Sequence, residues 1–165
     1  MSAIASFYLV RKPDVEQLKH LAAQPVGADT GGKWHDSYWE FLLAHGRELE
    51  QFESSGYVML DVFLFLDSRS IKVEEYCDEP LSDFLHEARG STILAFQAGP
   101  GKVLAELIAS NMPDENALGA FLSSPDMVSP VGDNSSAASA LDGVQVLTSW
   151  LSQIDEEVVG LLSIG

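Results

Sequence analysis

The segment Tyr57-Val-Met-Leu-Asp-Val-Phe-Leu-Phe-Leu66 is the most apolar run of ten residues in the chain, and Asp61 is its only charged residue. A run of this kind has to be buried, so we expect the hydrophobic core to form around it. Leucine, methionine and phenylalanine outnumber its two valines, and Ser55 is a suitable N-cap. These features favour a helix, although the run also fits a long buried strand, because periodicity alone does not separate the two.

Asp61 is the unusual residue of this segment. An ionised carboxylate in apolar surroundings costs on the order of several kcal/mol unless it is paired or hydrogen-bonded. Arg69, Arg11 or a helix N-terminus would supply a structural partner. The alternative is a carboxylate in a cleft with a raised pKa, which makes Asp61 a candidate catalytic residue.

The length and composition indicate one globular domain spanning residues 1–165, with 46% apolar residues. Cys77 is the only cysteine, which excludes an intramolecular disulfide and fits a reducing compartment. No basic residue precedes the apolar N-terminus, as it would in a signal peptide, and no run reaches the roughly 18 apolar residues of a membrane helix. We therefore expect a cytoplasmic protein that does not insert into a membrane.

The net charge of −16 is unevenly distributed along the chain. Residues 36–87 hold thirteen acidic and three basic side chains, and no lysine or arginine follows Lys102. Such a surface repels phosphate backbones, so the charge argues against nucleic-acid binding and favours a basic protein as a partner. A merely solvated acidic surface is the ordinary alternative. The candidate interaction surface is a group of four carboxylates around Cys77, where they disfavour the thiolate: Glu74, Glu75, Asp78 and Glu79.

Apolar spacing, prolines and glycines predict the remaining elements. The predicted strands span residues 3–10, 91–97 and 157–164, with a short edge strand at 71–76. The predicted helices span residues 13–23, 34–45, 57–66, 80–89, 102–110, 113–123 and 137–154, and residues 47–53 could add a helical turn. Residues 24–33 and 125–136 are predicted to be mobile loops. Because helices separate the strands, we expect an α/β or α+β domain with a small mixed, partly parallel sheet of three to five strands packed by about six helices.

The predicted helix 34–45 holds the densest group of chemically useful side chains, including His35 and His45. His35 could act as a base, but its neighbour Asp36 does not face it on a helix. No serine or cysteine nucleophile is linked to these histidines by a recognisable spacing. An amphipathic helix with inward aromatic residues and surface histidines is the ordinary alternative.

Gly99-Pro100-Gly101-Lys102 follows a predicted strand and opens a predicted helix, which makes Gly99, Gly101 and Lys102 candidate anion-binding residues. The segment lacks the spacing of a phosphate loop and the third glycine of a dinucleotide fingerprint, so a plain turn is the alternative. The four histidines are scattered and no ligand motif is present. The sequence therefore predicts neither a metal site nor a cofactor.

The two ends of the chain resemble the YfbM-like family of small bacterial proteins of unknown function. The resemblance lies in the N-terminal strand Met-Ser-Ala-Ile-Ala-Ser-Phe-Tyr-Leu-Val, in the long helix around 144–153 and in the closing Leu-Leu-Ser-Ile-Gly. Lys33-Trp34-His35 is similar to the start of a helix in that family. The resemblance covers about a third of the chain and implies no activity.

Two functional hypotheses follow from the sequence. The first is a non-enzymatic binding or regulatory module with an acidic interaction surface, of which an immunity-type inhibitor of a basic toxin is one example. The second is a small hydrolase or ligand-binding enzyme whose site lies near the 34–45 helix and Asp61. The enzyme requires a pocket in which His35 or His45 meets Asp61, whereas the binding module does not.

Overall fold

The computed structural model describes residues 3–28, 34–124 and 136–165. They form one domain of mixed α and β structure, as predicted. Four strands make a sheet in the order β4-β1-β6-β5, and their bounds are Ala5–Arg11 (β1), Arg47–Glu48 (β4), Thr92–Phe96 (β5) and Val158–Ile164 (β6). Strands β2 (Gly27–Ala28) and β3 (Trp34–His35) pair separately as a short ribbon.

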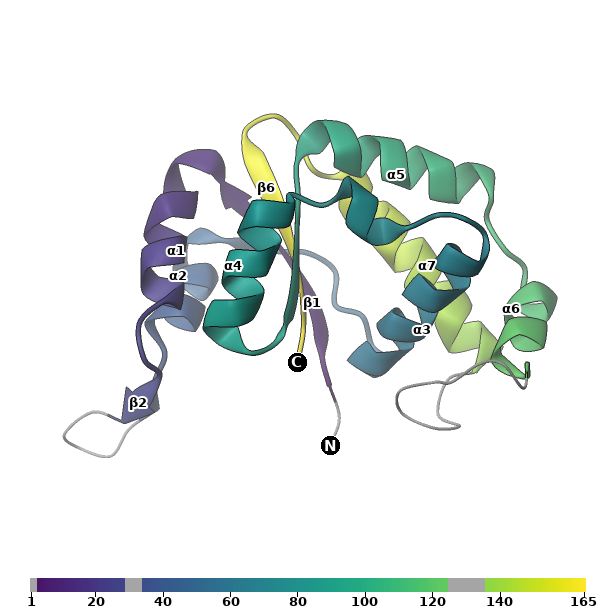
Figure 1. Cartoon of the computed structure of the whole chain (residues 1–165), viewed down its shortest axis with the longest axis horizontal. Coiled ribbons are helices and arrows are strands. Elements are labelled where there is room, and N and C mark those ends of the chain that lie inside the picture. Colours follow the sequence, from purple (N-terminus) through teal and green to yellow (C-terminus); the bar gives the residue numbers. More distant parts are fainter. Residues whose placement is uncertain (1–2, 29–33, 125–135) are drawn as a thin grey trace.

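Helices lie on both sides of the sheet (Figure 1). One side carries α1 (Val15–Ala22), α2 (Ser37–His45) and α4 (Glu79–Arg89), with a 3-10 turn at Lys12–Asp14 before α1. The other side carries α3 (Gly56–Ser68), α5 (Ala98–Ser110), α6 (Glu115–Leu122) and α7 (Ala137–Ser152). A second 3-10 turn, Val73–Tyr76, connects α3 to α4.

The sheet separates two hydrophobic cores. Along β1, Ala5, Phe7 and Leu9 belong to the core beneath α3, α5 and α7, whereas Tyr8 and Val10 belong to the core beneath α1, α2 and α4. Successive side chains of a strand point to opposite faces, so a strand covered on both faces is apolar at every position. This explains why the N-terminal segment is apolar on both alternation phases.

Residues 57–66 lie within helix α3, so the helical interpretation of this apolar segment is confirmed. The Ser55 side chain accepts a hydrogen bond from the Tyr57 amide at the start of α3. Gly56 allows close approach to β1, because a Cβ there would lie 2.8 Å from the carbonyl carbon of Ile4. Asp61 is 2% exposed, and it interacts with another group of the protein.

The expected parallel pairing is wrong, because all three strand pairs in the sheet are antiparallel. A parallel strand pair needs a crossover, usually one helix, that carries the chain back to the end of the sheet where the first strand began. Here α5 and α7, which pack against each other, both lie between β5 and β6, so the chain direction reverses once more. Gly101 at the start of α5 contacts Ile154, which follows the end of α7. The chain therefore enters β6 at the end of the sheet where it left β5, and the two strands run in opposite directions.

Four local predictions are also wrong. Residues 71–76 do not form an edge strand but contain the 3-10 turn, and residues 47–53 contain the short strand β4 rather than a helical turn. The Gly99-Pro100-Gly101 segment lies within the first turn of α5, where the fixed φ of proline and its missing N–H are tolerated. Helix α2 begins at Ser37 instead of Trp34, because Asp36 is its N-cap.

The other predicted helices and strands are confirmed with shifts of a few residues at their ends. Residues 29–33 and 125–135 of the two predicted loops lie outside the described residues, so the predicted mobility of these loops remains a prediction. The described part of the 24–33 loop contains strand β2, which the sequence did not predict. No helix in the described part of the chain is long and apolar enough to cross a membrane.

Candidate functional site

The three candidate catalytic residues lie apart in the structure. His35 precedes α2 and His45 is its last residue, on one side of the sheet, while Asp61 is buried in α3 on the other. The His45 ring stacks on Phe41, with 4.5 Å between ring centroids. The four-stranded sheet therefore separates both histidines from Asp61.

The candidate anion site at the start of α5 is surrounded by acidic groups. The backbone amide of Gly101 donates to the Gln97 carbonyl oxygen, so it is not available to a ligand. Gly99 and Lys102 are exposed and line a cavity with three carboxylates, those of Glu106, Asp155 and Glu156. These carboxylates oppose an anion at this place.

The acidic group around Cys77 divides into two parts. Asp78 serves the fold, because its carboxylate accepts hydrogen bonds from the Leu81 amide at 3.2 Å and from the Gln97 side chain at 2.8 Å. The carboxylates of Glu74, Glu75 and Glu79 belong to exposed residues. Three side chains of this group therefore face solvent and can contact a partner.

The Cys77 thiol is not a reactive thiolate. Burial, together with the nearby carboxylates of Glu74 and Asp78, raises the pKa of Cys77 to about 12. Its Sγ lies 3.5 Å from the Val73 carbonyl oxygen, to which it donates. The expectation that this environment disfavours the thiolate is confirmed.

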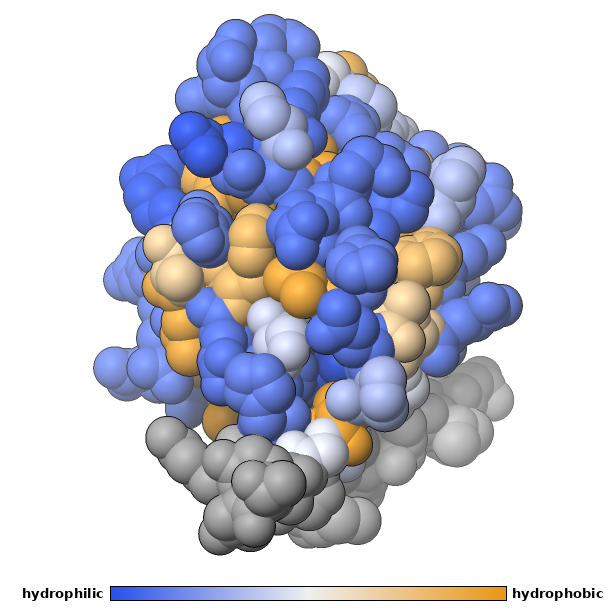
Figure 2. Space-filling view, turned by 90° about the vertical axis from the view of Figure 1, so that its left-hand side faces the viewer, coloured by the Kyte–Doolittle hydropathy of each residue, from blue (hydrophilic) through white to orange (hydrophobic). Residues whose placement is uncertain are grey.

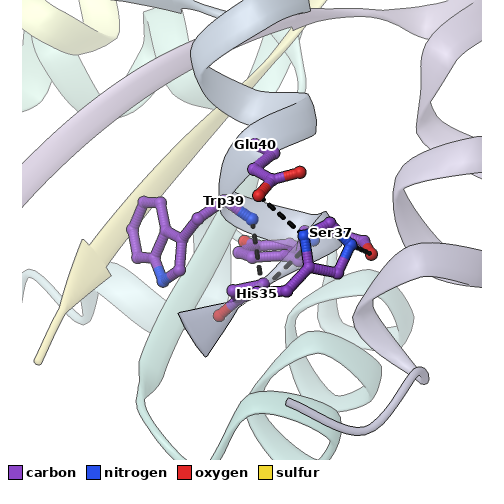
Figure 3. A network of polar contacts seen from close by, with 6 residues as sticks. His35, Ser37, Trp39 and Glu40 are labelled. Carbon is purple, nitrogen blue, oxygen red and sulfur yellow. Dashed lines mark hydrogen bonds and ion pairs between the residues drawn. The ribbon is translucent and has the colours of Figure 1, made fainter. Parts of the chain in front are cut away.

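A chain of polar contacts that the sequence did not predict runs through His35 (Figure 3). The Ser37 hydroxyl lies 3.0 Å from Nε2 of His35, and the Glu40 carboxylate lies 2.8 Å from Nδ1. This is the order of groups in a serine, histidine and acid triad. The contact forms because His35 lies in β3 and the chain bends at Asp36, whereas a helix through His35 would have kept these residues apart.

The surroundings of this array are those of a surface cluster. The side chains of His35 and Glu40 are 57% and 59% exposed, so water competes for their hydrogen bonds. The amides of Tyr38 and Trp39, which could serve as oxyanion donors at the start of α2, both donate to Asp36. The indole of Trp39 points away from the array (Figure 3).

Arg89 joins α4 to α2 across 53 residues of sequence. Its guanidinium forms an ion pair with Asp36 and lies 4.7 Å from the centre of the Tyr38 ring. The Arg89 side chain is only 8% exposed. Burial raises the pKa of Tyr38 well above its usual value, while the charge of Arg89 acts in the opposite direction. Asp36 therefore fixes the start of α2 in two ways, as its N-cap and as the partner of Arg89.

A cavity of about 360 Å³ lies beside these residues, and we refer to it as the α2 cavity. Residues from β1, α2, the end of α4 and β6 surround it, with the adjoining chain ends. They are Ile4, Ser6, Tyr38, Trp39, Arg89, Ser91, Ser163 and Gly165. The Tyr38 hydroxyl is buried and has no hydrogen-bond partner among the described residues.

The outer surface on the side of α1 and α2 is mostly hydrophilic, with apolar side chains interspersed near its middle (Figure 2). Leu43 on α2, which is 68% exposed, is the most exposed of the large apolar residues described. Nowhere in residues 3–28, 34–124 and 136–165 do three or more histidine, cysteine or acidic side chains gather closely enough to hold a metal ion.

Comparisons of the chain with protein-family models, curated proteins and solved structures find no match. The resemblance of the chain ends to the YfbM-like family therefore stays a prediction.

Proposed function

We propose that this protein is a non-enzymatic binding module that uses exposed carboxylates to dock a basic protein. The observation that carries the proposal is the exposure of Glu74, Glu75 and Glu79 on one continuous segment of a chain with a net charge of −16. We refer to these three residues as the acidic segment. An immunity-type inhibitor of a basic toxin, working in the cytoplasm, is one form of such a module.

The pairing of the basic side chains supports this proposal. Most of the described lysines and arginines already have carboxylate partners within the chain: Arg11, Lys12, Lys19, Lys72 and Arg89. The partner of Lys72 is Glu75 of the acidic segment, 3.8 Å away. One carboxylate of the segment is therefore already paired, and the excess charge that remains for a partner is negative. The separation of both histidines from Asp61 adds support, because the expected enzyme site requires them to meet.

The test is affinity capture from the cells that express the protein, followed by measurement of the captured partner's affinity. The triple variant Glu74→Gln, Glu75→Gln, Glu79→Gln should bind the partner roughly tenfold more weakly, because each exposed ion pair contributes about 0.2–1 kcal/mol. The loss should shrink at high salt, where exposed charges are screened.

A matched control keeps the net charge of the triple variant. The variant Glu53→Gln, Glu115→Gln, Asp142→Asn removes three exposed carboxylates of other segments and should bind as the parent does. Equal losses in the two variants would show that only the total charge matters. Capture of no basic partner would contradict the proposal itself.

One specific observation favours a second function from a different class, a small hydrolase. The Ser37, His35 and Glu40 contacts have the connectivity of a nucleophile, a base and an orienting acid. In such a reaction the Ser37 oxygen attacks an ester carbonyl while His35 takes the hydroxyl proton. His35 then gives the proton to the departing alcohol, and water hydrolyses the acyl-serine.

A fluorophosphonate probe distinguishes this function from the binding module. A hydrolase predicts covalent labelling that is lost in both Ser37→Ala and His35→Ala and kept in Ser152→Ala, which changes an exposed serine on α7. A binding module without catalytic chemistry predicts no labelling of Ser37 above that of Ser152.

A further inference from the structure

The α2 cavity differs from the other cavities described in having no acidic residue in its lining. The cavity between α1 and α4 includes Glu16 and Asp78, and the cavity at the start of α5 includes three carboxylates. The chain has 25 aspartates and glutamates, yet none is among the residues that line the α2 cavity. The Asp36 carboxylate pairs with the wall residue Arg89 and offsets part of its charge, but the lining itself adds no aspartate or glutamate, unlike the linings of the other two cavities.

The polar groups of the α2 cavity suit a negatively charged ligand. Arg89 contributes a nearly buried guanidinium, whose planar set of N–H donors exceeds what its single carboxylate partner, Asp36, requires. Ser6, Ser91 and Ser163 bring hydroxyl groups to the same cavity. A guanidinium with nearby hydroxyls is a donor set that fits a carboxylate, which accepts several hydrogen bonds.

The remaining walls are apolar. Ile4 and the aromatic residues Tyr38 and Trp39 line the cavity, and its volume of about 360 Å³ is in the range of sites for small organic molecules. We propose that the α2 cavity binds a small organic carboxylate, with the carboxylate at Arg89 and the serine hydroxyls and an apolar body against Trp39 and Ile4. This site is separate from the acidic segment, so the two proposals stand or fall independently.

Tyr38 is the wall residue whose own hydrogen bonding is incomplete. Its hydroxyl is buried, and no partner for it exists within the described residues. An unpaired buried hydroxyl costs free energy in the folded protein, and few such groups persist in native structures without another role. The hydroxyl is closed off from solvent, so it marks an unsatisfied group in a wall residue and is not counted among the donors open to the ligand.

The test is a titration with acetate, benzoate, phenylacetate and indole-3-acetate, each compared with its amide. Binding is followed through the indole N–H resonance of Trp39, with Trp150 as the internal reference because it is fully buried in the other core. At least one aromatic carboxylate should shift the Trp39 signal saturably and leave Trp150 unchanged. Its amide should bind about tenfold more weakly, because a charge-assisted hydrogen bond is lost.

Two variants separate binding at Arg89 from a general effect. Arg89→Lys should weaken carboxylate binding about tenfold, because lysine lacks the planar fork. The matched control Arg69→Lys alters an arginine on the other side of the sheet, against Phe65, and should bind as the parent does. Ser91→Ala leaves the Arg89 and Asp36 pair in place, so it reports on the cavity with the fold preserved, and it should also weaken binding.

Three results would overturn the proposal. The first is that no carboxylate of the series shifts Trp39. The second is that amides or inorganic phosphate bind as tightly as the aromatic carboxylates, which would remove the specificity for an organic carboxylate. The third is that Arg89→Lys and Ser91→Ala both bind as the parent does, which would place any binding outside the α2 cavity.

Discussion

Replacement of Tyr38 by phenylalanine should stabilise this protein. The substitution removes a buried hydroxyl that has no hydrogen-bond partner in the described structure and keeps the ring. The ring retains its contact with the Arg89 guanidinium at 4.7 Å and with Trp39, whose ring centroid is 5.6 Å away. An unsatisfied buried hydroxyl costs about 1–3 kcal/mol, so we expect a gain of about 1 kcal/mol in the free energy of unfolding. For a chain of this length the gain corresponds to a rise of about 2–4 °C in Tm.

Tyr8 is the matched control for this prediction, and urea denaturation with thermal melting measures both variants. Tyr8 is also buried, but its hydroxyl interacts with the Glu48 carboxylate, which helps to raise the pKa of Tyr8. Tyr8→Phe should therefore lower the free energy of unfolding by about 1 kcal/mol, the opposite direction. If Tyr38→Phe destabilises the protein as much as Tyr8→Phe does, the Tyr38 hydroxyl has a partner and the reasoning is refuted.

Three further predictions concern the fold. Asp61→Asn should change the free energy of unfolding by more than about 1 kcal/mol, because Asp61 is 2% exposed, and an unchanged melting curve would show that its charge is not part of the interior. Asp36→Ala should lower the free energy of unfolding by about 3 kcal/mol in urea denaturation, because it removes both the N-cap of α2 and the ion pair with Arg89. Asp114→Ala removes only the N-cap of α6 and should lower it by about 1 kcal/mol. Equal losses would argue against a contribution from the ion pair. The pKa values of Cys77 and Tyr8 are raised to about 12 from ordinary values near 9 and 10, so stability should be lost as the pH rises from about 9 towards 12. Cys77→Ala should make the fall in Tm shallower over that range, and an identical pH profile would contradict the assignment.

The central helix was predictable because its signals are local. Ser55 lies where an N-cap is needed, and the apolar residues that follow have high helix propensity. The strands at both ends were predictable for the same reason, since a strand covered on both faces is apolar at every position. The strand directions were not predictable, because they depend on how α5 packs against α7, which no short stretch of sequence encodes.

The residues of the candidate site also divide into those with a local sequence signal and those that only the fold brings together. The Asp36 and Arg89 pair joins residues far apart in the sequence, so no spacing rule could have found it. The contact between Ser37 and His35 was missed because the helix was expected to begin at Trp34. The sequence Asp36-Ser37 before an apolar run was a usable signal, since aspartate is a favoured N-cap and would have placed His35 outside the helix.

The most direct test of the proposed function is the affinity of a captured basic partner for the two charge-matched variants. We expect the variant with Glu74, Glu75 and Glu79 neutralised to bind roughly tenfold more weakly than the parent at low salt. The variant with Glu53, Glu115 and Asp142 neutralised should bind as the parent does. Equal affinities of the two variants would show that the acidic segment is not the docking surface.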